Sequence, residues 1–178
     1  MPIKIRHATA NDISLLKELI ALSARGLSIG YYTPAQTESA IRYVFGVDTQ
    51  LIADGTYFVV EDEEQIIACG GWSKRNTLFG GDQFKTEADP LLNPATDAAR
   101  VRAFFVHPDN ARQGVGMLLI KACEEAAIAN GFHQMEMGAT LPGVPFYAKM
   151  GYLAIEDISI TLPDGLLMGI VKMTKRLK

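Results

Sequence analysis

The residues whose types and spacing could do chemistry gather in one short segment of the chain, residues 105–119. There an apolar, strand-like stretch ends in a turn that contains Gly114 and Gly116, and an apolar helical pattern follows. Because glycine has no Cβ, the backbone at these positions can lie close to a ligand. The first turn of a helix also has unpaired N–H groups and the positive end of the helix dipole. These features predict a site for a phosphate or pyrophosphate group, to which Arg112 would add a positive charge.

Two other phosphate-binding motifs do not fit this turn. No third glycine stands three residues after Gly116, so the dinucleotide-binding fingerprint is excluded, and no Gly-Lys-Ser/Thr of a P-loop follows. On the turn alone, an ordinary helix start that contains glycines remains an alternative. The order of the surrounding elements favours the phosphate site, because the strand, His107-Pro108, the glycine pair and the apolar helix are followed by the stretch from Phe146 to Tyr152.

In this order of motifs the chain resembles the GNAT superfamily of N-acetyltransferases. Members of that family have a Gln/Arg-x-x-Gly-x-Gly/Ala turn after the fourth strand and often a Phe-Tyr-x-x-x-Gly-Phe/Tyr stretch after the fifth. Here Gly114 and Gly116 match the glycine positions, and residues 146–152 match the second motif. The first position of the turn is Ala111 instead of Arg or Gln, and Arg112 could supply the charge one residue later. The resemblance covers most of the chain and is weakest before residue 57 and between 73 and 99.

The resemblance implies an α/β fold (an α+β mixed sheet) whose central sheet is mostly antiparallel and splayed between its fourth and fifth strands, with helices on both faces. The chain has 178 residues, of which 48% are hydrophobic and 21% charged, as expected of one globular domain over residues 1–178. Periodicity predicts strands at 3–7, 57–60, 66–72, 101–106, 134–137, 152–161 and 166–174, and helices at 13–24, after Thr33, at 112–130 and at 144–150. From residue 73 to about 99 the pattern is lost, which favours either a lid over a substrate or a disordered insertion.

By resemblance, the protein would transfer an acetyl group from acetyl-CoA to a primary amine by direct attack in a ternary complex. The backbone of residues 104–106 would pair with pantetheine, the Val106 N–H would stabilise the oxyanion, and Tyr147 would protonate the departing thiolate. The residues expected to bind acetyl-CoA are Phe104, Phe105, Val106, Arg112, Gln113, Gly114, Val115, Gly116 and Met117.

The acceptor end is less defined. Tyr31 and Tyr32 lie where GNAT enzymes often line the acceptor pocket, but they could instead form a surface patch. Arg100 and Arg102 share one face of the predicted strand, which favours ion pairs with an acidic loop over the alternative, a carboxylate on the substrate.

No general base is evident in the sequence. Glu61 and Glu136 are distant candidates, and deprotonation through ordered water is the alternative. We expect His107 to be a turn residue instead of a base. Cys123 falls on the apolar face of the predicted helix, so we do not expect a thioester on cysteine.

Composition excludes several other classes of function. The net charge of −3 and the isoelectric point near 5.6 argue against a nucleic-acid partner. No apolar run reaches the ~20 residues that span a bilayer, and the N-terminus has no apolar signal core, so we expect no membrane partner and a cytoplasmic location. Two widely separated cysteines predict neither a metal site nor a disulfide framework.

Two alternatives to a small-molecule N-acetyltransferase remain open at this point. One is a non-catalytic module that binds or senses acyl-CoA, and the other is an N-acetyltransferase for proteins or peptides. The terminal hairpin also offers an edge for a homodimer.

Overall fold

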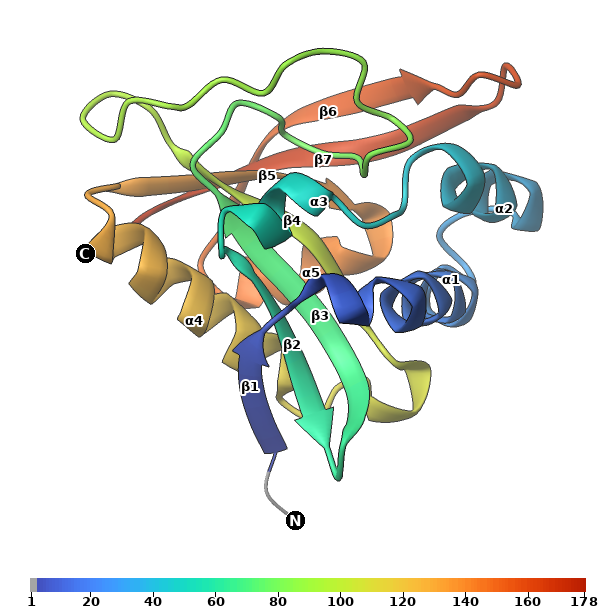
Figure 1. Ribbon diagram of the computed structural model, residues 1–178. Coiled ribbons are helices and arrows are strands. Elements are labelled where there is room, and N and C mark those ends of the chain that lie inside the picture. Colours follow the sequence, from blue (N-terminus) through green and yellow to red (C-terminus); the bar gives the residue numbers. More distant parts are fainter. Residues whose placement is uncertain (1–2) are drawn as a thin grey trace.

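The computed structural model describes residues 3–178, which form a seven-stranded sheet with helices on both faces (Figure 1). The strands are β1 (Ile3–His7), β2 (Tyr57–Asp62), β3 (Gln65–Ser73), β4 (Ala99–Val106), β5 (Gln134–Thr140), β6 (Leu153–Thr161) and β7 (Leu167–Arg176). The helices are α1 (Ile13–Leu27), α2 (Pro34–Tyr43), α3 (Thr49–Ala53), α4 (Val115–Ala129) and α5 (Val144–Lys149), with 3-10 turns η1 (Ala10–Asp12), η2 (Pro108–Asn110) and η3 (Leu141–Gly143). None of the helices in this described part of the chain is long and apolar enough to cross a membrane.

The sheet has the strand order β1-β2-β3-β4-β5-β7-β6, in which only the β4–β5 pair is parallel. That pair is short, because its register covers only Ala99 opposite Met135 and Arg100 opposite Glu136. Beyond these residues the two strands part. The predicted fold, a mostly antiparallel sheet splayed between its fourth and fifth strands with helices on both faces, is therefore confirmed.

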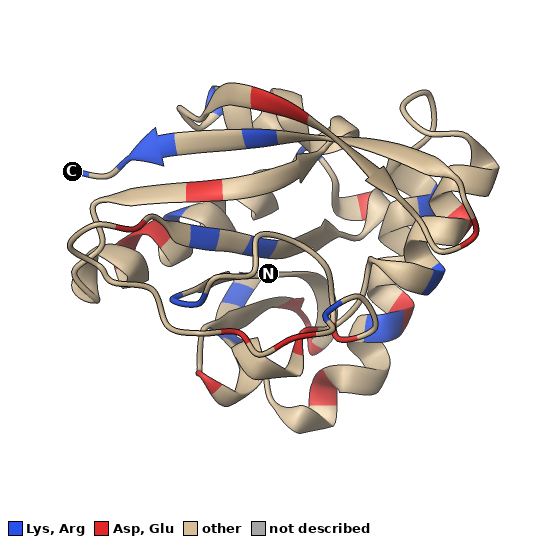
Figure 2. Ribbon diagram, turned by 90° about the horizontal axis from the view of Figure 1, so that it is seen from above, with Lys and Arg blue, Asp and Glu red and all other residues tan. Residues whose placement is uncertain are grey.

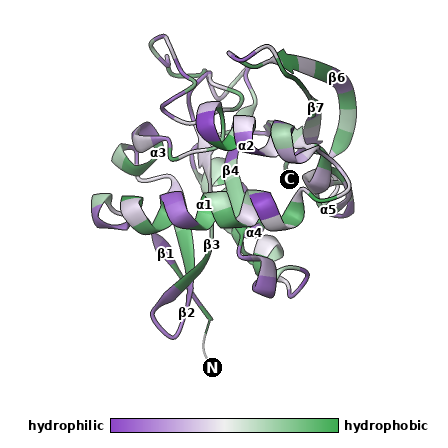
Figure 3. Cartoon of the chain, turned by 90° about the vertical axis from the view of Figure 1, so that its right-hand side faces the viewer, coloured by the Kyte–Doolittle hydropathy of each residue, from purple (hydrophilic) through white to green (hydrophobic). Residues whose placement is uncertain are grey.

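The two faces of the sheet are covered by different helices because successive residues of a strand point to opposite sides. Val59 and Cys69 pack with the apolar stripe of α1, and their neighbours Val60 and Ala68 pack with the start of α4. Apolar and polar stretches alternate along α1 in Figure 3, as the spacing of its apolar residues predicts. The central strands are thus held between α1 and α4.

A β-bulge bends β4 three residues after Arg100, its last residue paired with β5. Between Cys69 and Gly71, one residue of β3 lies opposite two residues of β4, Ala103 and Phe104. Ala103 has φ of 52°, in the left-handed region, which costs a residue with a Cβ about 1–2 kcal/mol. The Tyr57 hydroxyl donates a 2.7 Å hydrogen bond to the Ala103 carbonyl and helps to hold this conformation. The bulge therefore turns β4 at the point where the two strands separate.

Two local predictions need correction. The long helix begins at Val115 and not at Arg112, because Arg112 and Gly114 have φ values of 62° and 85° and cannot continue a right-handed helix. Helix α3 was not predicted, although Asp48 caps it in the ordinary way, accepting a 3.0 Å hydrogen bond from the Gln50 N–H.

The segment from residue 74 to 98 is a folded excursion that lies over the sheet near α3, as the long green loop in Figure 1 shows. The Gly81 N–H donates to the Val44 carbonyl at 2.8 Å, and the Asp82 N–H donates to the Val47 carbonyl at 3.0 Å. These bonds attach the excursion to the connection between α2 and α3.

A buried ion pair between Arg102 of β4 and Asp48, just before α3, holds the same segment through its contacts with Gly80 and Lys85. Arg102 Nη2 lies 2.9 Å from Asp48 Oδ2 and donates to the Gly80 carbonyl at 2.6 Å, while Lys85 Nζ lies 2.8 Å from Asp48 Oδ1. The side chains of Arg102 and Asp48 are 1% and 0% exposed. Burial lowers the pKa of Arg102, and the negative charge of Asp48 acts against this effect. The ion pair of Arg102 is thus with Asp48, at the start of α3.

We predict that Asp48→Asn lowers the free energy of unfolding by about 3–5 kcal/mol, because it leaves Arg102 buried without its counter-ion. Urea unfolding followed by circular dichroism measures this loss. The matched control is Glu38→Gln, which removes a carboxylate paired with Arg25 where both side chains are 56% exposed, and it should leave the midpoint nearly unchanged. Equal midpoints for the two variants would contradict the anchoring role of Asp48.

Candidate functional site

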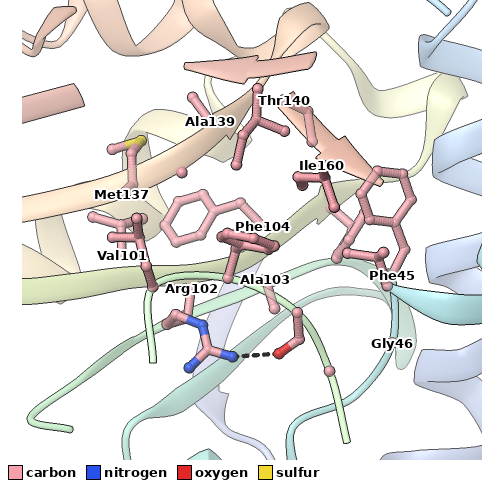
Figure 4. Close-up of a pocket in the computed structure, with 18 of the residues that line it drawn as sticks. Phe45, Gly46, Val101, Arg102, Ala103, Phe104, Met137, Ala139, Thr140 and Ile160 are labelled. Atoms are coloured by element: carbon pink, nitrogen blue, oxygen red, sulfur yellow. Dashed lines mark hydrogen bonds between the residues drawn. The ribbon is translucent and has the colours of Figure 1, made fainter. Parts of the chain in front are cut away.

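A cavity of about 80 Å³ lies where β4 and β5 part. Its walls come from residues 101–105 of β4 and 137–140 of β5, and from residues 44–46, 78–81, Tyr147 and three residues of the β6–β7 hairpin. In Figure 4 the Phe104 side chain points between the two strands toward Met137 and Ala139, while Arg102 points to the opposite side of β4. The cleft is thus open along one edge of β4.

Beyond Arg100, the backbone groups of β4 that face the cleft are not paired with β5. The His107 N–H donates to the Ile67 carbonyl of β3 at 2.8 Å. Because successive N–H groups along a strand point to opposite edges, the Val106 N–H points to the side that β5 leaves open. Its direction suits the role of oxyanion donor that the family resemblance implies.

The turn after β4 is stabilised by its own side chains. His107 Nδ1 accepts a 3.1 Å hydrogen bond from the Asp109 N–H, and Gln113 Nε2 donates to the Asp109 carbonyl at 3.1 Å. His107 therefore has the turn role expected of it, and its imidazole is used within the turn.

Glycine is required at the two positions of the turn for different physical reasons. Gly114 has φ of 85°, and a Cβ built on it would meet no heavy atom within 4 Å, so the space beside it is open. No side chain of residues 3–178 caps the first amides of α4, which therefore remain available to an anion. Gly116 is instead needed by packing, because a Cβ there would lie 3.0 Å from Phe146 Cζ of α5. Arg112 is exposed beside the open turn.

Tyr147 of α5 stands at the base of the cleft. Its ring packs edge-on against Phe104 with 6.1 Å between ring centroids, and the residue is 8% exposed. Within residues 3–178 its hydroxyl has no hydrogen-bond partner, and burial raises its pKa, so the phenol stays protonated at neutral pH. Tyr152 differs, because its hydroxyl donates a 2.8 Å hydrogen bond to Glu124 and its ring is in the core.

The tyrosines of the α1–α2 loop lie outside the cavity lining. The Tyr32 hydroxyl donates to the Gly169 carbonyl at 2.6 Å and accepts from the Leu141 N–H at 2.9 Å, so it ties this loop to β7 and to η3. Tyr31 is 48% exposed. Contacts of this kind give Tyr32 a structural role and leave Tyr31 on the surface.

Arg100, the other arginine of β4, belongs to a row of paired charges at the end of the cleft where β4 and β5 still pair. Arg100 Nη1 lies 3.3 Å from Glu136 Oε1, and Lys172 Nζ lies 3.2 Å from Glu136 Oε2. Seen from above, basic and acidic residues are interspersed over the molecule (Figure 2). Glu136 is thus engaged by two cations. Glu61 belongs to β2, two strands from β4, and is paired with Arg6 of β1.

Comparison with known proteins identifies this arrangement. A family model described as the acetyltransferase (GNAT) domain matches residues 53–153. The chain belongs to the GNAT acetyltransferase family. No curated protein matches the chain significantly.

Solved structures share the fold of this GNAT chain. A GCN5-related N-acetyltransferase from Rhodopseudomonas palustris has 20% identity and a TM-score of 0.74, covering 99% of this chain and 97% of that one. A phosphinothricin acetyltransferase (Pat) from Sinorhizobium meliloti, in complex with AcCoA, has 19% identity and a TM-score of 0.62, covering 99% and 89%. The ribosomal-protein-S18-alanine N-acetyltransferase from Escherichia coli has 12% identity and a TM-score of 0.60, covering 99% and 95%.

Sequence reasoning missed much of the lining of the GNAT cleft. The missed residues are Val44–Gly46, Leu78–Gly81, Val101, Ala103, Met137–Thr140, Ile160, Met168 and Ile170. Most are apolar residues that sequence patterns assign to an ordinary core, so their type carries no functional signal. Asp48 offered one usable signal for α3, because its position before a short apolar run is that of an N-cap. Residues 3–178 contain no group of three or more His, Cys, Asp or Glu side chains that could hold a metal ion.

We predict that Tyr147→Phe and Tyr152→Phe differ in stability. Tyr152→Phe removes a hydrogen bond to a carboxylate and should lower the free energy of unfolding by about 1–2 kcal/mol. Tyr147→Phe removes no hydrogen bond and should change it little. Urea midpoints of both variants measure this, and a larger loss in Tyr147→Phe would mean that this hydroxyl is structural.

Proposed function

We propose that the protein transfers the acetyl group of acetyl-CoA to a primary amine of a small molecule. The observation that carries the proposal is the open edge of β4, which runs from the uncapped amides at the start of α4 to Tyr147 at the base of the cleft. The S. meliloti enzyme of the same fold was solved in complex with AcCoA, which supports this choice of acyl donor.

The residues present fit such a donor. A pyrophosphate would lie against the backbone N–H groups of residues 112–117, in the open space beside Gly114, with Arg112 adding a positive charge. The pantetheine arm would run along residues 104–106 of β4, where its amides replace the missing pairing with β5. These contacts would bring the thioester to the cavity beside Tyr147.

In the proposed reaction the neutral amine nitrogen attacks the thioester carbonyl carbon. The Val106 N–H donates to the oxyanion that forms, and a donor of this kind is typically worth about 3 kcal/mol. The tetrahedral intermediate then collapses: the C–S bond breaks, and the thiolate takes the proton of the Tyr147 hydroxyl. The nitrogen loses its proton to water, which restores the tyrosine through solvent. The products are the amide and free CoA.

Among residues 3–178, the lining of the cavity includes no carboxylate and no imidazole, and its titratable side chains are Arg102 and Tyr147. Neither can act as a general base at neutral pH, because Arg102 is a buried cation and Tyr147 has a raised pKa. We infer that a water carries the proton away. Burial of the amine in this cavity also favours its neutral form.

Protein substrates and a non-catalytic binding role are the alternatives. The E. coli enzyme of the same fold acts on a ribosomal protein. The fold itself therefore does not decide between a small-molecule acceptor and a protein acceptor. A small acceptor is favoured because residues 78–81 form part of the cavity wall and leave a volume of about 80 Å³. The unpartnered hydroxyl of Tyr147 in the cleft favours catalysis over binding alone.

We predict that the protein binds acetyl-CoA with micromolar affinity and does not bind NADH, as measured by calorimetric titration. Gly114→Ala should weaken acetyl-CoA binding about tenfold, because alanine at φ of 85° is strained by about 1–2 kcal/mol and the turn would shift. Gly169→Ala is the control, since a Cβ there meets no atom within 4 Å and its φ is ordinary. A folded protein that does not bind acetyl-CoA would refute the proposed function.

We also predict that Tyr147→Phe lowers kcat about 10²-fold at neutral pH with little change in the KM for acetyl-CoA, because it removes the general acid. Release of CoA in the presence of an accepted amine measures this, with Tyr152→Phe as the control that keeps the wild-type kcat. Because the pKa of Tyr147 is raised, the wild-type rate should not fall through loss of this proton below pH 10. An unchanged kcat in Tyr147→Phe would remove its role as acid.

A further inference from the structure

One end of the cavity has an apolar wall made by four separate parts of the chain. It consists of Val44, Phe45, Phe79, Ile160, Met168 and Ile170. All but Phe45 and Phe79 are buried in the cluster that joins α2 to the β6–β7 hairpin, and these two rings are partly buried against it. An acceptor that reaches the thioester from this end would therefore contact hydrocarbon.

Phe79 is held in place as part of this wall. Its ring lies 5.3 Å from that of Phe84, and a Cβ added to Gly138 of β5 would come within 3.2 Å of Phe79 Cδ1. The backbone on either side of it is bonded, because Arg102 donates to the Gly80 carbonyl at 2.6 Å and the Gly81 N–H donates to the Val44 carbonyl at 2.8 Å. The wall is thus a fixed surface opposite β5.

None of the described residues that line this end of the cavity brings an unpaired charge to it. Arg102 is the charged residue in the lining, and it is 1% exposed and paired with Asp48 at 2.9 Å. Its Nε–H has no acceptor among residues 3–178, but that atom is itself enclosed. A carboxylate on the acceptor would therefore be buried without a counter-ion, and a second ammonium group would meet no carboxylate. Either charge would lose its hydration without compensation.

We propose that the acceptor is a small primary amine whose remaining part is apolar and uncharged, and that Phe79 sets this specificity. The proposal rests on the function proposed above. An amine of this class gains from burial of its alkyl or aryl group against the wall, at about a fourfold gain in kcat/KM for each added methylene. The same desolvation favours the neutral amine, which fits a cleft that has no general base.

The test is a series of small primary amines that differ in charge or in the size of their apolar group, with CoA release measured at saturating acetyl-CoA. Butylamine is compared with 4-aminobutanoate and 1,3-diaminopropane, and ethylamine, propylamine and 3-methylbutylamine extend the apolar series. We expect kcat/KM for butylamine to exceed both charged analogues at least 10²-fold and to rise along the apolar series. Equal or faster turnover of either charged analogue, or of a peptide with a free N-terminus, would overturn the proposal.

Variants of Phe79 test the wall directly. Phe79→Ala should flatten the rise in kcat/KM along the apolar series, because it removes apolar surface against which the longer alkyl groups pack. Phe79→Glu should raise turnover of 1,3-diaminopropane relative to butylamine. Leu91→Ala is the control from the same excursion, since Leu91 is 63% exposed and lies outside the cavity lining. Identical preferences in wild type and both Phe79 variants would remove its role in specificity.

The titration with acetyl-CoA distinguishes failure of the proposed acceptor class from failure of the proposed function. If acetyl-CoA binds and charged amines or the peptide are turned over best, only the acceptor class proposed here is wrong. If acetyl-CoA binds and no amine in the series is turned over, the acceptor class is also wrong. If acetyl-CoA does not bind to the folded protein, the proposed function itself fails.

Discussion

The separation of β4 from β5 is the constraint on which the rest of the structure depends. Two parallel strands would normally continue to pair, and here pairing stops after Arg100 and Glu136. The bulge at Ala103 holds a strained backbone conformation, and the Tyr57 hydroxyl supports it from the next strand but one. That local cost leaves free amides and a cavity in the middle of a sheet. Every residue proposed for chemistry borders this opening or the turn that follows β4.

The part of the site nearest the turn could be predicted from the sequence, and the opposite end could not. The turn with Gly114 follows β4 directly and begins α4, so its residues lie within one short stretch whose pattern carries the information. The other end joins Phe45, Phe79, Ile160 and Met168, which are far apart in the chain and have the composition of an ordinary core. The left-handed backbone at Arg112 was also missed, because non-glycine residues rarely adopt it.

Charge is placed around the cleft rather than in it. The row of paired charges of Arg100, Glu136 and Lys172 joins three strands at the end of the cleft where β4 and β5 still pair, and Arg102 is neutralised beneath the wall by Asp48. The two arginines that sequence reasoning considered for a substrate carboxylate are therefore both occupied by acidic partners from the protein. What the described lining offers to an acceptor is hydrocarbon, backbone and the hydroxyl-bearing side chains of Tyr147 and Thr140.

The anchoring of residues 78–85 has a consequence for the kinetics of the catalytic cycle. A segment that opens and closes in each cycle is usually attached by few and weak contacts, so that its motion is fast. Here opening would separate Lys85 from Asp48 and the Gly80 carbonyl from Arg102 in a largely buried setting, which is a costly event. We therefore regard this segment as a stationary wall, with substrates and products passing along the length of the cleft. Turnover in such an enzyme is limited by diffusion of substrates and products along a cleft of constant width and by the chemical step. Solvent viscosity would then affect the rate only through diffusion.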